Sequence, residues 1–108
     1  MLYHLIVYAP VAAAAAIRSA LTAAGAGAIG NYDGCSFSCR GTGRFRGNER
    51  ACPAAGKPGR VEEVAEERIE VVVEKAKLVD VLRGVVAVHP YEEPAIHVLP
   101  MENYKAFL

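Results

Sequence analysis

The densest group of ionisable side chains in the chain is the segment HPYEEPA, residues 89–95. It holds an imidazole, a phenol and two carboxylates between two prolines. As chemistry, His89 could act as a general base with Glu92 or Glu93 as its partner. As structure, the prolines would fix a rigid connection whose phenol, from Tyr91, is buried with its hydroxyl hydrogen-bonded. We favour structure or ligand contact over catalysis, and we expect His89 to interact with the carbonyls that end the preceding helix.

A second group of side chains suggests a metal. The thiols of Cys35 and Cys39 are accompanied by the imidazoles of His89 and His97. In an extended strand, residues four apart are separated by about 13 Å, whereas metal–sulfur bonds are about 2.3 Å long. One ion could bind both thiols only at a sharp bend or across subunits. We therefore expect no metal and no other cofactor, and we keep copper or zinc binding as the alternative.

The third group is a glycine- and arginine-rich stretch, GTGRFRGNER, which begins at Gly41. Residues 40–60 carry six basic side chains against one acid, and a glycine-rich backbone beside arginines can hold an anion. The stretch lacks the GK[ST] ending of a phosphate-binding P-loop. Residues 62–74 carry six acids against one arginine, so the two stretches could also pair with each other. Internal pairing and binding of an anionic small molecule both remain open.

Composition limits the classes of partner. The 108 residues carry twelve basic and twelve acidic side chains, so nothing favours nucleic acid or an anionic membrane overall. The apolar run at residues 11–17 is much shorter than the roughly 20 residues of a membrane span. The first residues lack the basic region of a secretory signal, and three cysteines do not form a disulfide framework. We expect a single cytoplasmic domain over residues 1–108, with no membrane and no nucleic-acid partner.

Hydrophobic periodicity predicts the elements that position these groups. We expect four strands, two helices, a long loop and a terminal helical turn. In chain order they are a strand at 2–8, a helix at 11–25, an irregular strand at 28–40, a loop at about 41–60, a strand at 66–74, a helix at 75–88, a short strand at 95–99 and the turn within 101–108.

This order is that of a ferredoxin-like βαββαβ sandwich of the α+β class, with two helices on one face of an antiparallel sheet. The other face is left bare. We place Ile6, Tyr8, Val72 and Val98 on it, because consecutive residues in a strand point to opposite faces. An apolar bare face would favour self-association.

Four motifs carry a family resemblance: GAGAIGNYDGCSF from Gly25, GTGRFR from Gly41, RIEVVV from Arg68, and HPYEEPA from His89. Together they resemble the PII/CutA-like insert domain of the NGG-one-interacting-factor-three-like family, also called the YqfO family or GTP cyclohydrolase I type 2 homologues. The HPYE segment is also similar to CutA proteins. The motifs follow the family's order over most of the chain, whereas the loop ERACPAAGKPG departs from the family's asparagine–proline loop.

The resemblance implies a PII-like, CutA-like homotrimer that binds small ligands in clefts between subunits. It implies that an anionic small molecule contacts the loop and the HPYEEPA segment, and the candidate ligand-binding residues are Arg44, Phe45, Arg46, His89, Tyr91, Glu92 and Glu93. Full-length family members also carry a two-metal domain to which nothing in this chain corresponds. We therefore expect a stand-alone binding or regulatory module with no catalytic residues, and the CutA likeness suggests divalent copper or zinc binding as the alternative.

Overall fold

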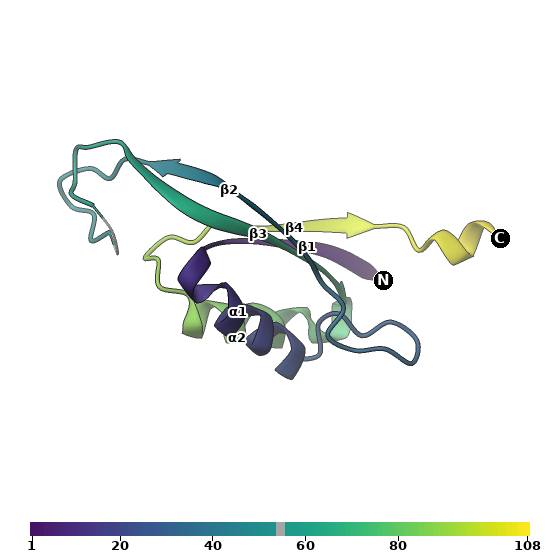
Figure 1. Cartoon of the computed structure of the whole chain (residues 1–108). Coiled ribbons are helices and arrows are strands. Elements are labelled where there is room, and N and C mark those ends of the chain that lie inside the picture. Colours follow the sequence, from purple (N-terminus) through teal and green to yellow (C-terminus); the bar gives the residue numbers. More distant parts are fainter. Residues whose placement is uncertain (54–55) are drawn as a thin grey trace.

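The computed structural model describes residues 1–53 and 56–108, and it consists of an antiparallel sheet with two helices on one face (Figure 1). The strands lie in the order β2-β3-β1-β4. The predicted α+β, ferredoxin-like plan is confirmed. The elements are β1 (Leu2–Pro10), α1 (Val11–Ala23), β2 (Phe37–Phe45), β3 (Glu62–Glu74), α2 (Leu78–Val88) and β4 (Ile96–Met101), with short 3-10 turns η1 (Lys75–Lys77) and η2 (Tyr104–Phe107).

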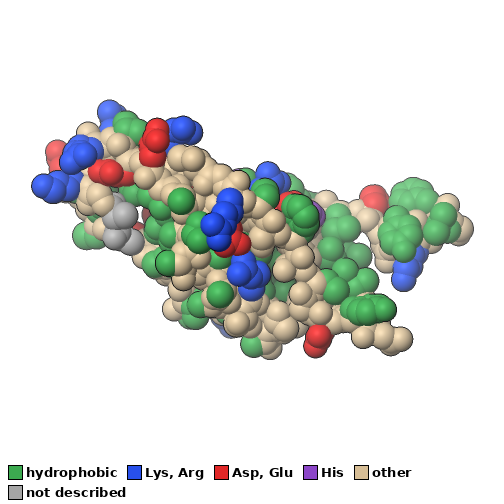
Figure 2. Space-filling view, in the orientation of Figure 1, with side chains coloured by type: hydrophobic (Ala, Val, Ile, Leu, Met, Phe, Trp, Pro, Cys, Tyr) green, Lys and Arg blue, Asp and Glu red, His purple; other side chains and the backbone are tan. Residues whose placement is uncertain are grey.

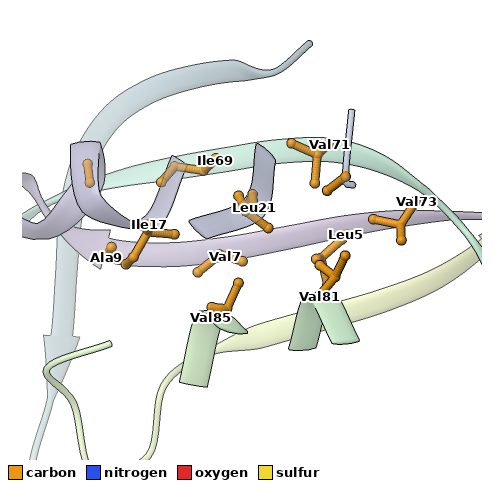
Figure 3. Packing of buried hydrophobic residues seen from close by; sticks show 12 residues of the cluster. Leu5, Val7, Ala9, Ile17, Leu21, Ile69, Val71, Val73, Val81 and Val85 are labelled. Atoms are coloured by element: carbon orange, nitrogen blue, oxygen red, sulfur yellow. The ribbon is translucent and has the colours of Figure 1, made fainter. Parts of the chain in front are cut away.

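The core lies between the sheet and the helices (Figure 3). Alternate residues of β1 and β3 face the helices, which is the period of two that a half-buried strand requires. Helix α1 contributes Ile17 and Leu21, and α2 contributes Val81 and Val85, each at the helical spacing of four. The larger side chains of this core are at most 1% exposed, apart from Val71 at 6%: Leu5, Val7, Ile17, Leu21, Ile69, Val73, Val81 and Val85.

Strand β2 is where the sequence prediction was wrong. It was expected at residues 28–40, but it begins at Phe37 and continues to Phe45, so the loop expected at about 41–60 begins at residue 46. Residues 54–55 of that expected loop lie outside the described ranges. Residues 28–36 instead form a short turn closed by a bridge between Ile29 and Tyr32. The glycine-rich GTGRF sequence has low β propensity, but pairing along the 13-residue strand β3 holds it extended.

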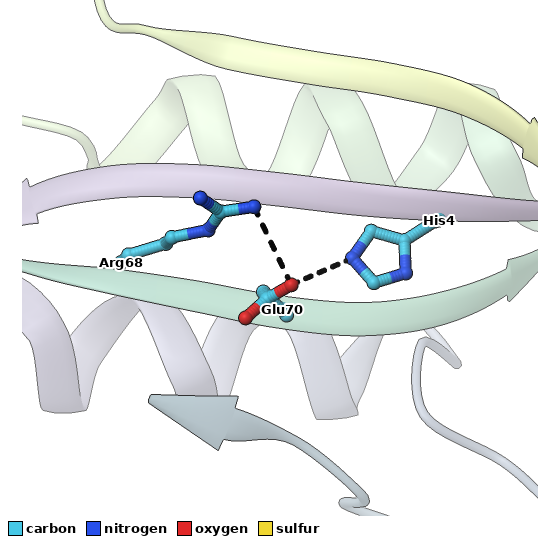
Figure 4. Close-up of polar contacts among 3 residues, drawn as sticks. All are labelled: His4, Arg68 and Glu70. Atoms are coloured by element: carbon cyan, nitrogen blue, oxygen red, sulfur yellow. Dashed lines mark hydrogen bonds and ion pairs between the residues drawn. The ribbon is translucent and has the colours of Figure 1, made fainter. Parts of the chain in front are cut away.

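The face of the sheet away from the helices is mixed in character, not uniformly apolar as predicted. Glu70 on β3 accepts from His4 Nε2 at 2.9 Å, and Arg68 Nη2 lies 3.6 Å from the same carboxylate oxygen (Figure 4). Ile6, Tyr8 and Val72 share this face, as expected. Val98 does not, because it pairs with Leu5 and therefore lies on the helix side.

The molecule is elongated. Its radius of gyration is 15.1 Å, against about 13 Å for a compact domain of this length. The free end of the β2–β3 ribbon and the carboxyl-terminal turn both project beyond the helices (Figure 1). Charged side chains of both signs gather over the ribbon end, and hydrophobic side chains cover the projecting turn (Figure 2). Within the described ranges, no helix is both long and apolar enough to cross a membrane.

Candidate ligand-binding pocket

A pocket of about 480 Å³ lies where the β2–β3 ribbon meets the connection between α2 and β4. Its walls come from segments that are far apart in the sequence. The lining residues are Tyr8 of β1, residues 43–47 at the end of β2, Ala51 and Pro53 of the loop, Glu66 of β3, and Tyr91, Glu92, Glu93 and Ala95 of the connection.

The connection is fixed to the sheet by His89. Its Nε2 lies 2.8 Å from the carbonyl oxygen of Tyr8, and its Nδ1 accepts the backbone N–H of Tyr91 at 3.1 Å. A carbonyl only accepts and a backbone N–H only donates, so the ring is the neutral tautomer with its proton on Nε2. The imidazole is buried, and it is the backbone N–H of His89, not the ring, that donates to a carbonyl at the end of α2, that of Val85 at 2.9 Å. His89 is therefore a structural residue with no nitrogen free for proton transfer.

The backbone N–H of Tyr8 also forms a hydrogen bond with this connection. This N–H donates to the carbonyl of Ala95 at 3.1 Å, one step before β4 begins. Both ends of the HPYEEPA segment are therefore tied to a single residue of β1. This double attachment sets the position of the three side chains between them, which line the pocket.

Tyr91 joins the connection to β3. Its hydroxyl donates to Glu66 Oε2 at 2.8 Å, so the expected hydrogen bond is present, although the ring is half-buried and not fully buried as predicted. Burial raises the pKa of Tyr91 above its usual value, and the hydrogen bond to Glu66 and the charge of that carboxylate raise it further. The phenol is consequently neutral throughout the physiological range and acts as a donor.

The pocket needs glycine at position 43. A Cβ at Gly43 would collide with the Glu66 carboxylate, which lies against the backbone of β2.

Two further contacts join the walls of the pocket. The ring of Phe45 lies 6.2 Å from that of Tyr91, centre to centre. Glu92 accepts the N–H of Cys52 at 3.2 Å and so ties the loop to the connection.

The arginines lie at the rim. Arg44 Nε donates to Glu63 at 3.0 Å in an exposed ion pair, and Arg60 lies 3.7 Å from Glu62. The predicted pairing between the basic loop and the acidic strand is therefore present in part. Arg46 lines the pocket, and it forms no ion pair with any residue in the described ranges.

Six of the seven ligand-binding candidates line this pocket, and His89 lies behind it. The sequence analysis missed Glu66 and Tyr8, which contribute a buried carboxylate and an aromatic ring. Strand alternation could have placed Glu66 on the bare face, because residues of β3 at even positions lie opposite the apolar face that includes Ile69. Its burial could not have been anticipated, because it depends on a connection 25 residues away.

The four weak metal candidates are not brought together within the subunit. His89 uses both ring nitrogens, and the His97 ring packs edge-on against Tyr8 at 5.5 Å. Cys39 pairs with Arg68 in the sheet, while Cys35 lies in the turn before β2. Among residues 1–53 and 56–108, no three histidine, cysteine or acidic side chains are grouped as metal ligands would be.

Comparison with known proteins places the chain beside one segment of larger proteins. No family model matches it. It is 45% identical over 96 residues to a GTP cyclohydrolase 1 type 2 homolog of Mycobacterium tuberculosis, a match that covers 89% of this chain and 25% of that protein. The chain thus spans about a quarter of the length of the curated relatives it matches.

Solved structures give the same result. A Bacillus cereus protein related to NIF3 superposes with a TM-score of 0.79 at 39% identity, over 94% of this chain and 26% of that one. The periplasmic divalent cation tolerance protein CutA from Archaeoglobus fulgidus superposes with a TM-score of 0.69 at 22% identity, over 95% of this chain and 86% of that one. The second likeness concerns the fold alone.

Proposed function

We propose that this chain, which is similar to one segment of NIF3-related proteins and shares the fold of CutA, is a self-associating module that binds a small molecule without transforming it. One observation carries this proposal: segments distant in the sequence converge on an aromatic-lined pocket of about 480 Å³, which is within the range of small-ligand sites. The HPYEEPA segment forms one wall, and its imidazole is used to hold that wall in place. That this module works in the cytoplasm stays a prediction.

At the rim, Arg44 and Arg46 would contact an anionic group of the ligand. The ion pair of Arg44 with Glu63 is exposed on both sides, and such pairs contribute little, so its guanidinium can exchange partners at small cost. Bidentate contact of a guanidinium with phosphate or carboxylate is strong and directional. These two arginines therefore suit a phosphate or carboxylate group at the pocket entrance.

Isothermal titration with nucleotides and other phosphates at low salt tests this proposal. We expect measurable binding by the wild type and at least tenfold weaker binding after Arg44→Ala combined with Arg46→Ala, because a hydrogen bond to a charged group contributes about 1.5–3 kcal/mol. Arg83→Ala is the matched control, since this arginine is exposed on α2 away from the pocket. No heat with the wild type, or an unchanged isotherm for the double variant, would count against the proposal.

The absence of catalysis is part of the proposal. His89 has no free nitrogen, and Glu92 accepts a backbone N–H, so neither group is poised as a general base. Turnover of a phosphate ester that is lost in Glu92→Gln would contradict this view.

Self-association would give the projecting segments partners. The carboxyl-terminal turn exposes Tyr104, Phe107 and Leu108, and the face of the sheet away from the helices exposes Phe37 and Leu99. Large exposed apolar side chains on an elongated domain are what a subunit interface requires. We expect a homotrimer in sedimentation equilibrium, as the family resemblance implies. A stable, well-folded monomer at micromolar concentration would rule this out.

The alternative is binding of divalent copper or zinc. Such a site would have to combine residues from different subunits, because Cys35, Cys39, His89 and His97 are not brought together in one. Elemental analysis of the oligomer after exposure to both metals, followed by dialysis, discriminates the two proposals. Less than one ion per trimer would end the metal alternative.

A further inference from the structure

The floor of the pocket carries a buried carboxylate without a cationic partner. Glu66 is 9% exposed, and its contact in the structure is the hydroxyl of Tyr91 on Oε2. No lysine, arginine or histidine in the described part of the chain forms an ion pair with it. A buried charge is costly unless an opposite charge compensates it, and a phenol supplies a dipole only.

The surroundings of Glu66 are those that favour an organic cation. The rings of Phe45 and Tyr91 line the same pocket, and aromatic faces attract ammonium and guanidinium groups. The Tyr8 ring also lines it, but the Arg68 guanidinium already lies 5.8 Å from the centre of that ring. Two further carboxylates, Glu92 and Glu93, line the wall formed by the connection.

The arginines do not cancel this negative charge. The lining includes three carboxylates against two arginines, and the Arg44 guanidinium is bonded to Glu63, which is not among the lining residues. Glu66 is the buried charged residue of the lining, whereas Arg44, Arg46, Glu92 and Glu93 are all exposed, so the charge at the buried end of the pocket is negative. That end of the pocket would therefore attract a cation.

We propose that the ligand of this pocket carries a primary ammonium or guanidinium group, which pairs with Glu66 while the attached apolar body packs against the exposed side of the Phe45 and Tyr91 rings. This inference rests on the proposed function, because it assigns the chemistry of the inner end of the same site. Together with the anionic group at Arg46, it describes a ligand with opposite charges at its two ends.

Three small probes separate the two ends of the pocket. Phenethylamine is a cation with an aromatic body, phenethyl alcohol is a neutral compound of nearly the same shape, and phenyl phosphate is an anion. We expect the wild-type oligomer at pH 7 to bind the amine about tenfold more tightly than the alcohol, as measured by ligand-detected NMR titration. Equal affinity for the amine and the alcohol would overturn the inference.

Two neighbouring glutamates provide matched variants. Glu66→Gln keeps an acceptor for the Tyr91 hydroxyl but removes the charge, so it should lose the preference for the amine. Glu67→Gln removes a carboxylate of equal burial on the opposite face, so it should keep that preference. An amine preference that survives Glu66→Gln, or that is lost equally in both variants, contradicts the assignment. Circular dichroism confirms that each variant is folded.

A second variant covers the case in which Glu66→Gln does not fold. Glu93 is exposed, so Glu93→Gln is expected to fold and to weaken amine binding by about twofold to threefold through the loss of a nearby charge. An unchanged amine affinity in Glu93→Gln would then count against the inference. If phenyl phosphate binds but the amine binds no more tightly than the alcohol, the assignment of a cation at Glu66 is overturned and the proposed function stands. If none of the three probes binds, both the cation assignment and the proposed function are overturned.

Discussion

Glu66 and Glu67 are consecutive residues of β3 with the same small exposure, 9%, yet they lie in opposite chemical settings. Glu67 points to the helix side, where Arg18 of α1 donates to it at 2.7 Å. Glu66 points to the other face, where a neutral phenol is its partner. The alternation of a strand thus separates a carboxylate whose charge is neutralised by an ion pair within the fold from one that is hydrogen-bonded to a neutral phenol.

These two carboxylates differ in whether an opposite charge compensates their burial, and this difference is the basis on which we propose Glu66 as a ligand-binding residue. Burying either carboxylate costs free energy. For Glu67 the ion pair with Arg18 offsets that cost, whereas Glu66 has no such ion pair among the described residues. Gly43 leaves room for the Glu66 carboxylate, because it has no side chain there. The HPYEEPA connection covers the same carboxylate through the hydroxyl of Tyr91. Changes to that connection or to the glycine should affect Glu66 and leave Glu67 untouched.

The largest expected effect is that of His89→Ala. It removes the ring that fixes the connection carrying Tyr91 to Glu66, and it leaves the carbonyl of Tyr8 and the N–H of Tyr91 without their partner. We expect a loss of about 2–4 kcal/mol in the free energy of unfolding, measured with urea. His97→Ala, on an exposed ring against Tyr8, is the control and should cost less than about 1 kcal/mol. Equal losses would show that His89 does not hold the connection.

Next in size is Gly43→Ala. The new Cβ would collide with the Glu66 carboxylate and force it away from β2, so we expect a loss of about 1–3 kcal/mol in thermal or urea unfolding. Gly41→Ala, two residues earlier in the same strand, places its Cβ in open space and should change stability by less than about 0.5 kcal/mol. If both variants unfold alike, Glu66 does not lie against the backbone of β2.

Neutralising each glutamate tests the comparison itself. Glu67→Gln breaks the ion pair with Arg18, which is partly exposed, and should cost about 1 kcal/mol. Glu66→Gln removes a buried charge without an ionic partner and should leave stability unchanged or raise it slightly. Urea unfolding of the two variants side by side measures the difference. The reverse order would mean that Glu66 is the compensated residue.

The smallest expected effect is on the free energy of unfolding at alkaline pH. The unfolded phenol loses its proton near pH 10, whereas burial and Glu66 keep the pKa of Tyr91 higher in the folded state. Tyr91 therefore contributes full stability below pH 10 and loses it as pH rises, by about 0.4 kcal/mol at pH 10 itself. Tyr91→Phe should remove this part of the pH dependence of urea unfolding, and Tyr104→Phe, on an exposed ring, should not. The same slope in both variants would show that the buried phenol is not the source of the pH dependence.

The core was predictable from the sequence because its signals are local. Ile69, Val71 and Val73 occupy every second position of a strand, and the stripe that includes Val81 and Val85 follows the helical period. All five are core residues. The helix expected at residues 11–25 ends at Ala23, and Gly25 follows it with a φ of +98°, a left-handed conformation that favours glycine.

The site was predictable only in part. Resemblance to a family selected six residues that do line one pocket, but the key carboxylate was missed. Glu66 resembles its neighbours in an acidic stretch, and only the cross-strand position of Gly43 and the distant Tyr91 make it buried. The polar centre formed by His4 and Glu70 was missed for the same reason, since it arises from the pairing of β1 with β3.

The central claim is that this pocket, with Glu66 at its floor, is where the protein meets its ligand. Mapping amide chemical shifts of the isotopically labelled protein on addition of phenethylamine tests it most directly. The account predicts that the largest shifts fall on Gly43, Phe45, Tyr91 and Glu93, and that they vanish in Glu66→Gln but persist in Glu67→Gln. Shifts centred elsewhere, or the same shifts in both variants, would contradict it.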